Sequence, residues 1–328
     1  MSVIFSDICV VISLLQIARG LFILISMMNN RQRELISCAG LLLITIIWGF
    51  SFVVIKNSLD FITPMYMLAV RFTIAGVGLI LIFPRKTFRA SKASIKHGAL
   101  IGLMLFLAEV FQTYGINHTT AGKNAFLTTF YVIMVPVLHL IFNHKRPDRI
   151  CIIASVMAFV GLGMISLNGE KGILLGDWLT LICGIFYAAQ IVLIARYALE
   201  DDPIVISIYQ IVFAAIYSLI FAPITEGLPS IGMFGRDSVV GLLYIGLLST
   251  LLCFLVQNIC QKYAPPAPSA IIMSFESVFG AVFSAIFLKE RMTTKMIIGC
   301  VIMFVSVVLI EMPRKNGQDK LKESEHAV

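Results

Sequence analysis

The stretch AFLTTFYVIMVPVLHLIFNHKR occupies residues 125–146, and the stretch AIIMSFESVFGAVFSAIFLKER occupies residues 270–291. Each is an apolar run about long enough to cross a bilayer as a helix, and each ends in charged residues. The two runs align at an offset of 145 positions, which matches Ala125 with Ala270, Phe142 with Phe287 and Arg146 with Arg291. The chain therefore carries the same membrane-crossing unit twice.

The composition of the whole chain requires lipid as its solvent. Apolar residues make up 59% of the 328 residues, charged residues make up 13%, and the mean hydropathy is +0.95. A water-soluble surface cannot be built from so few charges. The net charge of +7 lies mainly in short segments between apolar runs, which is typical of a membrane protein and excludes a nucleic-acid partner. The seven cysteines stand singly, so we interpret them as packing residues without a disulfide or a metal.

Apolar runs bounded by charge, proline or glycine predict ten transmembrane helices. They cover residues 36–54, 64–83, 99–116, 121–142, 150–167, 178–197, 204–224, 239–259, 269–288 and 296–311. Five helices fall in each of two repeats, at residues 34–169 and 170–313. An apolar leader at residues 1–33 precedes them, and a charged tail at residues 314–328 is too polar to bury a core. The predicted fold class is an all-α integral membrane protein.

The two repeats are predicted to be inverted. The offset of 145 joins Gln112 with Gln257, and an offset of 139 joins Pro64 with Pro203 and Trp48 with Tyr187. Because five is an odd number, the second repeat begins on the opposite side of the membrane from the first. The repeats are then related by a pseudo-two-fold axis in the membrane plane, an arrangement typical of secondary transporters.

Basic residues predict the orientation of this body. Most of them, including Lys86 and Arg146, lie on one side of the predicted helices, whereas Arg236 belongs to a smaller group on the other side. Cytoplasmic segments are enriched in lysine and arginine. We therefore expect both ends of the ten-helix body in the cytoplasm and Arg236 outside.

The leader lies outside both repeats and contains Asp7, Gln16 and Arg19. No basic residue precedes its apolar run and no A-x-A site precedes the first core helix, so a cleaved signal peptide is not expected. We interpret the leader as an extension dispensable for transport; the alternative is an eleventh helix in which Asp7 and Arg19 find partners. A chain that begins at Met28 should insert and remain active, and loss of either property would make the leader part of the working fold.

Four motifs carry a resemblance to a known family over about residues 34–311. They are WGFSF at residues 48–52, AVRF at residues 69–72 after Pro64, AFLTTFYVIMVP at residues 125–136 and FLKER at residues 287–291. They resemble the drug/metabolite transporter superfamily, in particular its ten-helix EamA-type family. Ser277 and Lys145 stand where that family usually has proline and glutamate. The resemblance implies secondary transport of metabolites, amino acids or drug-like molecules, often as export, in a bacterial cytoplasmic membrane.

Ionisable residues at mid-membrane depth are the first candidates for a substrate or coupling site, because an uncompensated charge there costs about 2.5 kcal/mol or more. Three lie within apolar runs, namely Arg71, Glu109 and Glu276. Glu276 is the strongest candidate, since burial favours the protonated form of a carboxyl group and a proton carrier must bind a proton at neutral pH. Its alternative role is a carboxyl group satisfied by a neighbouring hydroxyl or amide. Glu109 is the second coupling candidate.

Arg71 resembles the second-helix arginine of the family. A guanidinium inside a bilayer needs a carboxylate or several carbonyl groups as partners. We interpret Arg71 as a structural charge that ties helices together, with substrate binding as the alternative. Its repeat counterpart, Gln210, is neutral.

Polar and aromatic residues at repeat-related positions complete the candidate site. They are Gln112 and Gln257, Tyr131 as the counterpart of Glu276, Trp48 with Tyr187, and Ser51 with Gln190. We expect them to cluster around the pseudo-two-fold axis and to line a cavity. For each aromatic ring the alternative is helix packing or an anchor at the membrane interface. An amide that faces lipid is costly, which favours the glutamines as cavity residues.

Three classes of function are weighed against these observations. The favoured class is a secondary transporter of a small molecule, coupled to protons or working by exchange. A membrane-embedded enzyme acting on a lipid-linked substrate would need catalytic residues clustered near one interface, and the sequence holds no such constellation. A channel or scaffold is disfavoured by the inverted repeat. The expected partners are a small-molecule substrate and membrane lipids, with no cofactor, and the expected assembly is a monomer or homodimer.

Overall fold

The computed structural model describes residue 20 and residues 28–143, 148–166, 174–228, 236–289 and 293–311, in which helices alternate with short turns and no strand occurs. The predictions for the charged tail and for most of the leader concern residues outside this part of the chain, as does the position of Arg146. The prediction of an all-helical membrane protein is confirmed. Eight of the described helices are long and apolar enough to cross a membrane, and Arg149–Met164 and Thr294–Leu309 are shorter apolar helices.

The helices follow one another in the same order in both repeats. The first repeat contains α2 (Asn30–Ser58), α3 (Pro64–Ile82), the short α4 (Pro84–Phe88), α5 (Lys92–Asn117), α6 (Ala121–Thr128), α7 (Tyr131–Asn143) and α8 (Arg149–Ser166). The second contains α9 (Leu175–Tyr197), α10 (Pro203–Glu226), α11 (Arg236–Leu243), the π-helix η2 (Tyr244–Leu252), α12 (Cys253–Gln261), α13 (Pro266–Met273), α14 (Glu276–Phe287) and α15 (Thr294–Glu311). The predicted fourth and ninth helices are each split, as α6 with α7 and α13 with α14.

Several helices begin where local sequence satisfies their free backbone amides. The Asn29 side chain accepts a hydrogen bond from the Gln32 amide at 2.9 Å, and Ser91 accepts one from the Ser94 amide at 3.0 Å. These caps extend α2 and α5 beyond the apolar runs that predicted them. Prolines open α3, α10 and α13, at a position where the missing N–H costs nothing.

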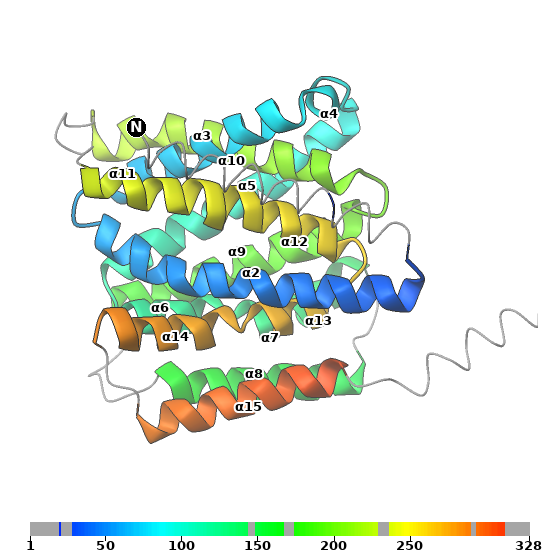
Figure 1. Cartoon of the computed structure of the whole chain (residues 1–328), viewed down its shortest axis with the longest axis vertical. Coiled ribbons are helices and arrows are strands. Elements are labelled where there is room, and N and C mark those ends of the chain that lie inside the picture. Colours follow the sequence, from blue (N-terminus) through cyan, green and yellow to red (C-terminus); the bar gives the residue numbers. More distant parts are fainter. Residues whose placement is uncertain are drawn as a thin grey trace, which may run out of the picture.

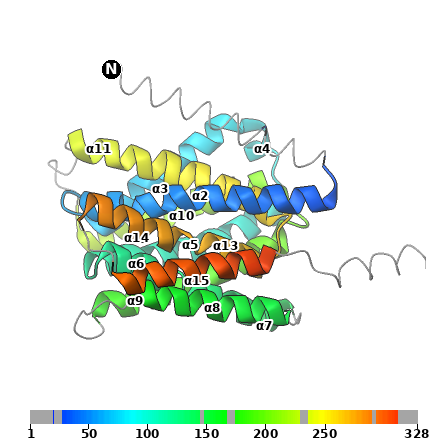
Figure 2. The same ribbon diagram turned by 60° about the horizontal axis from the view of Figure 1, so that its bottom comes forward.

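The helices lie side by side with their axes roughly aligned (Figures 1 and 2). In Figure 1, α8 and α15 pack together along one edge, and α3 and α10 along the opposite edge. Between these edges lie α2, α5, α9 and α12 together with the split helices. The helix contacts of one repeat recur when the two repeats are exchanged. The contact of α5 with α9 corresponds to that of α12 with α2, and the contact of α7 with α9 corresponds to that of α14 with α2. This reciprocity is what an inverted repeat requires.

Small residues allow the central helices to approach closely. A Cβ atom at Gly49 of α2 would lie 2.5 Å from the Phe279 Cβ atom of α14, and one at Gly102 of α5 would lie 2.5 Å from the Gln210 carbonyl oxygen of α10. Close backbone approach of this kind is typical of helix contacts in membranes. Large apolar side chains such as Leu43, Leu81 and Phe304 are instead more than half exposed on the outer surface. That surface faces lipid.

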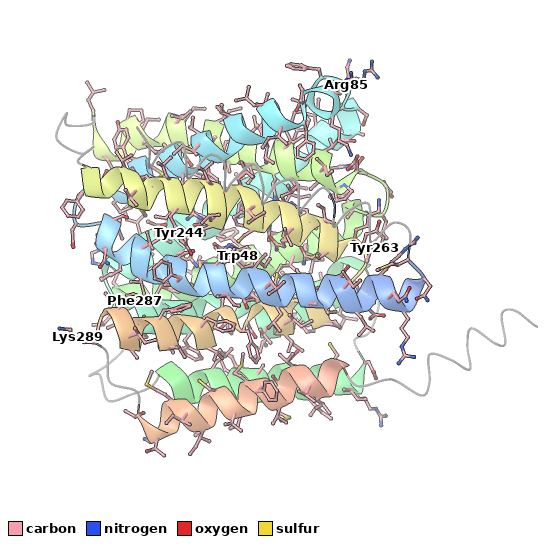
Figure 3. All side chains as sticks on the ribbon, viewed as in Figure 1. Trp48, Arg85, Tyr244, Tyr263, Phe287 and Lys289 are labelled. Atoms are coloured by element: carbon pink, nitrogen blue, oxygen red, sulfur yellow. The ribbon has the colours of Figure 1, made fainter. Side chains whose placement is uncertain are left out.

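Loops that the repeat assigns to one side of the membrane meet in the structure. Lys86, in α4, forms an ion pair with Asp202 at the start of α10. At the other end of the bundle, the Glu226 carboxylate accepts a hydrogen bond from the Met65 amide at 3.0 Å. Figure 3 places Arg85 and Lys289 at opposite ends of the molecule, as the predicted orientation requires.

Cysteine accessibility labelling tests the predicted topology. On a background from which the native cysteines are replaced, we expect Lys86→Cys and Arg146→Cys to react with an impermeant reagent from the cytoplasmic side only. Arg236→Cys should react from the outside only, because an odd number of crossings separates it from the other two positions. Reaction of all three variants from one side would show that the repeats are not inverted.

Candidate functional site

A small cavity lies at the centre of the bundle. Its volume is about 40 Å³, which is room for a few water molecules, since one needs about 10–15 Å³ by this measure. Eight of the nine predicted binding or coupling residues line it, namely Trp48, Ser51, Gln112, Tyr131, Tyr187, Gln190, Gln257 and Glu276. Arg71, predicted as a structural charge, lines it as well, whereas Glu109 is not among its described lining residues.

Two helix breaks flank the cavity at equivalent positions of the repeats. The helix formed by α6 and α7 is interrupted at Thr129 and Phe130, and the helix formed by α13 and α14 at Ser274 and Phe275. In each break a hydroxyl group donates to the preceding turn: Thr129 Oγ1 to the Phe126 carbonyl and Ser274 Oγ to the Ile271 carbonyl, both at 2.6 Å. Such bonds compete with the helical hydrogen-bond pattern. Both breaks therefore have a cause in local sequence.

The residues that restart the two helices meet each other. Tyr131 begins α7 and Glu276 begins α14, and the Tyr131 hydroxyl donates to Glu276 Oε1 at 3.1 Å. Positions exchanged by a two-fold axis can contact each other only close to that axis. This pair therefore marks the pseudo-two-fold axis. The neighbouring Ser277 hydroxyl donates to the Ala125 carbonyl at 3.0 Å and so ties α14 to α6.

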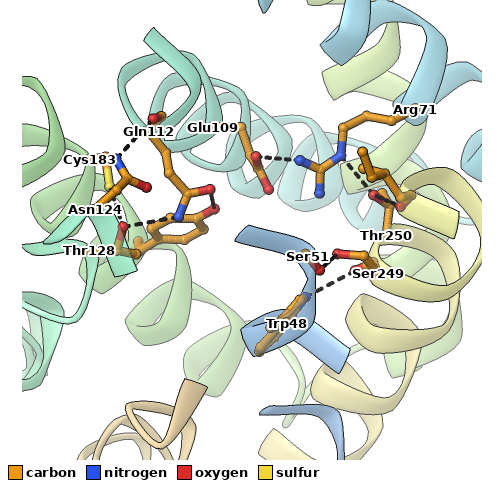
Figure 4. Close-up of polar contacts among 12 residues, drawn as sticks. Trp48, Ser51, Arg71, Glu109, Gln112, Asn124, Thr128, Cys183, Ser249 and Thr250 are labelled. Carbon is orange, nitrogen blue, oxygen red and sulfur yellow. Dashed lines mark hydrogen bonds and ion pairs between the residues drawn. The ribbon is translucent and has the colours of Figure 1, made fainter. Parts of the chain in front are cut away.

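Arg71 and Glu109 form a buried ion pair beside the cavity (Figure 4). Arg71 Nη1 lies 2.7 Å from Glu109 Oε2, and the two side chains are 2% and 3% exposed. Arg71 Nε also donates to Thr250 Oγ1 at 2.9 Å. The ion pair joins α3 to α5 and cancels its own charge. Glu276 is the acidic residue among the described residues that line the cavity, and its hydrogen-bond partner is the neutral hydroxyl of Tyr131.

Amide side chains form two short hydrogen-bonded chains at the cavity. Gln112 Nε2 donates to Thr128 Oγ1 at 3.0 Å, and the Tyr187 hydroxyl donates to Gln112 Oε1 at 3.4 Å. In the other repeat, Gln257 Nε2 donates to Gln190 Oε1 at 3.4 Å. Gln257 Oε1 is buried and has no hydrogen-bond partner within the described residues. An unmet acceptor that borders a cavity can bind a water molecule or a solute.

The π-helix η2 presents backbone and hydroxyl groups to α2. The Trp48 indole Nε1 donates to the Ser249 carbonyl at 3.0 Å, and the Ser51 hydroxyl donates to Ser249 Oγ at 2.8 Å (Figure 4). Within η2, Thr250 Oγ1 donates to the Ile245 carbonyl five residues earlier. π-Helical turns are rare and are often found at functional sites. Here η2 fixes the side chains of Trp48 and Ser51, which line the cavity.

Six lining residues were not predicted from the sequence. They are Phe52, Ile55, Ile191, Ser249, Phe254 and Met273. Ser249 could have been found, because Ser249 and Thr250 are adjacent hydroxyl residues within the apolar run of residues 239–259. The other five are apolar and carry no signal that distinguishes them from packing residues.

The arrangement offers hydrogen bonding, aromatic contact and one carboxyl group able to exchange a proton. Within the described ranges, no three histidine, cysteine, aspartate or glutamate side chains come together as ligands for a metal ion. The groups that converge on the cavity are suited to binding a small polar or amphipathic solute.

Known proteins resemble this chain in family, in sequence and in fold. The model of the EamA-like transporter family matches this chain twice, at residues 35–167 and 174–312. An uncharacterized transporter of Archaeoglobus fulgidus is 30% identical over 280 residues, which cover 85% of this chain and 87% of that protein. The S-adenosylmethionine/S-adenosylhomocysteine transporter of Chlamydia muridarum is 26% identical over 87 residues, or 26% of this chain and 27% of its own. A crystal structure matches with a TM-score of 0.69 at 15% identity, covering 84% and 96% of the two chains, and shows that the fold is shared.

Proposed function

Since this chain belongs to the EamA-like transporter family, we propose that it is a secondary transporter that exports a small metabolite, amino acid or drug-like solute across the cytoplasmic membrane. The central cavity carries this proposal. It gathers Glu276, three glutamines and five aromatic residues around the axis that relates the two repeats. Burying polar groups at this depth costs free energy unless they bind a solute, a proton or one another.

We propose that transport occurs by alternating access. The two repeats would rock about the axis marked by Tyr131 and Glu276, exposing the cavity first to one side and then to the other. Glu276 would bind a proton in one arrangement and release it in the other, which couples solute movement to a pH gradient or supports exchange. The charge of Arg71 is balanced by Glu109. Protonation of Glu276 is therefore the step that would change the net charge of the cavity.

The setting of this transporter follows the sequence predictions. We propose a bacterial cytoplasmic membrane, with both ends of the ten-helix body in the cytoplasm and five-helix repeats at residues 34–169 and 170–313. The working unit is a monomer or homodimer, surrounded by lipid. The outward-facing apolar surface of the described helices supports the lipid contact.

The function is tested in two stages. A thermal-shift screen of the purified protein over amino acids, nucleosides, cationic drugs and S-adenosylmethionine should find a solute that raises the unfolding temperature. S-Adenosylmethionine is included because the Chlamydia muridarum relative is named as its transporter. The solute found should then show saturable flux into proteoliposomes. Flux that does not saturate would indicate a channel, and turnover of a lipid-linked substrate without flux would indicate an enzyme.

A further inference from the structure

A buried ionic cluster lies at one end of the bundle, outside the lining of the cavity. Asp177, near the start of α9, lies 2.7 Å from Lys123 Nζ of α6, and these side chains are 3% and 10% exposed. The Thr119 hydroxyl, just before α6, donates to Asp177 Oδ1 at 2.9 Å. Lys56, at the end of α2, donates to the Ile116 and Thr119 carbonyls at 2.8 and 3.0 Å. The cluster thus ties α2, α5, α6 and α9 together.

A polar seam continues from this cluster to the cavity between α9 and α6. One layer below the ion pair, Asn124 Nδ2 donates to Thr180 Oγ1 at 2.7 Å. The next layer is the bond from Gln112 Nε2 to Thr128 Oγ1, at the cavity wall. Asp177, Thr180 and Tyr187 recur at intervals that place them on one face of α9. The seam therefore runs without a break from the end of the bundle to the polar side chains that line the cavity.

The backbones are in contact along the same seam. A Cβ atom at Gly176 of α9 would lie 2.5 Å from the Gly115 carbonyl oxygen of α5, and one at Gly115 would lie 2.4 Å from Thr180 Oγ1. Within the described residues, α5 and α9 leave no room for a solute between them at this level.

The repeat provides an internal comparison at the other end of the bundle. The two repeat offsets, 145 as for Tyr131 with Glu276 and 139 as for Trp48 with Tyr187, place other residues opposite the members of the cluster. Asp177 corresponds to Cys38, Lys123 to Pro268, Lys56 to Ala195 and Thr180 to Leu41. None of these counterparts carries a charge. The cluster therefore has no counterpart at the repeat-related positions, and the contacts of the other end, such as that between Lys86 and Asp202, involve different positions.

We propose that the ion pair of Lys123 and Asp177, supported by Thr119 and Lys56, is a gate that holds one end of the transporter closed. Opening this end requires a buried ion pair to break, whereas the ion pair at the other end, Lys86 with Asp202, is 35% exposed at both side chains and costs little to separate. A buried charge that loses its partner is strongly destabilised, so removing either Asp177 or Lys123 shifts the population toward the arrangement open at this end, where the remaining charge can be hydrated. The gate rests on the proposed alternating access but involves none of the cavity groups.

The gate is tested by labelling the cavity in membrane vesicles of known orientation. Ile55 lines the cavity one residue before Lys56, so Ile55→Cys reports access from the gated end. In an Asp177→Asn background, we expect its reaction with an impermeant thiol reagent, applied from the Lys123 side, to become roughly tenfold faster or more. The exchanged pair Lys123→Asp with Asp177→Lys should restore slow labelling. Lys123→Arg, which keeps the charge, should stay near the parent rate.

A matched control exists at the other end of the bundle. Asp202 pairs with Lys86, but both side chains are 35% exposed, so Asp202→Asn should leave the labelling rate unchanged. Labelling that stays slow in Asp177→Asn, or that accelerates equally from both sides, would overturn the gate. Failure of the exchanged pair to slow the reaction would also overturn it. Because labelling needs no solute, the absence of solute flux would count against the proposed function without affecting this result.

Discussion

Transport driven by a pH gradient is expected to fall by roughly a hundredfold when Glu276 is replaced by glutamine. Glutamine keeps the shape of the side chain and can still meet the Tyr131 hydroxyl, but it cannot bind and release a proton. Exchange of solute for solute should survive, because that half of the cycle needs no change in protonation. The measurement is uptake into proteoliposomes with and without a pH gradient, beside counterflow at a fixed pH.

Two variants serve as controls for Glu276→Gln. Glu226→Gln alters a carboxylate that caps the start of α3 through the Met65 amide, and it should retain full coupling. Tyr131→Phe removes the hydroxyl that donates to Glu276 and should shift the pH dependence without abolishing it. If Glu276→Gln shows the same pH dependence as the parent, Glu276 has no part in coupling.

The buried ion pair of Arg71 and Glu109 leads to the second large effect. Glu109→Leu leaves the Arg71 guanidinium buried without a carboxylate, so the free energy of unfolding should fall by about 3–5 kcal/mol. Replacing both residues, as Arg71→Met with Glu109→Leu, removes the unpaired charge and should recover most of the loss. Unfolding of the purified variants in detergent measures both effects.

The same double variant separates the two roles considered for Glu109. If its transport stays coupled to a pH gradient, Glu109 serves stability and its role as a coupling residue is excluded. Recovered stability with lost coupling would instead give the pair of Arg71 and Glu109 a part in coupling beyond stability. A single variant whose free energy of unfolding drops by less than about 1 kcal/mol would contradict the structural role of the pair.

Much of the fold was predictable because its main signals are periodic and repeated. Apolar run lengths predicted the membrane helices, and the offset between Tyr131 and Glu276 predicted that they would lie around one axis. They are in contact at 3.1 Å. The position of Arg71 in an apolar run also predicted that it would need a carboxylate or several carbonyl groups as partners. The identity of that partner could not be predicted, since sequence separation says nothing about which helices become neighbours.

The remaining features depend on hydrogen bonds that composition does not reveal. The break before Glu276 contains no proline or glycine. It arises because the Ser274 hydroxyl donates a hydrogen bond to the Ile271 carbonyl in the preceding turn. By hydropathy alone, residues 266–287 form one uninterrupted membrane span. The gate was missed for a similar reason, because Lys123 and Asp177 each resemble an ordinary charge at a helix end. Only their approach to 2.7 Å gives them a shared role.

The π-helix η2 has a consequence for which insertions and deletions the chain can tolerate. A turn that bonds five residues back holds more residues than an α-turn, and each residue turns an α-helix by about 100°. Deleting one residue between Tyr244 and Leu252 would let α-helical pairing resume and rotate α12 about its axis by roughly that angle. Gln257 would then leave the cavity and Asn258 would lose Ser207, to which it now donates at 2.9 Å. The length of this segment, more than its side chains, determines which face of α12 lines the cavity.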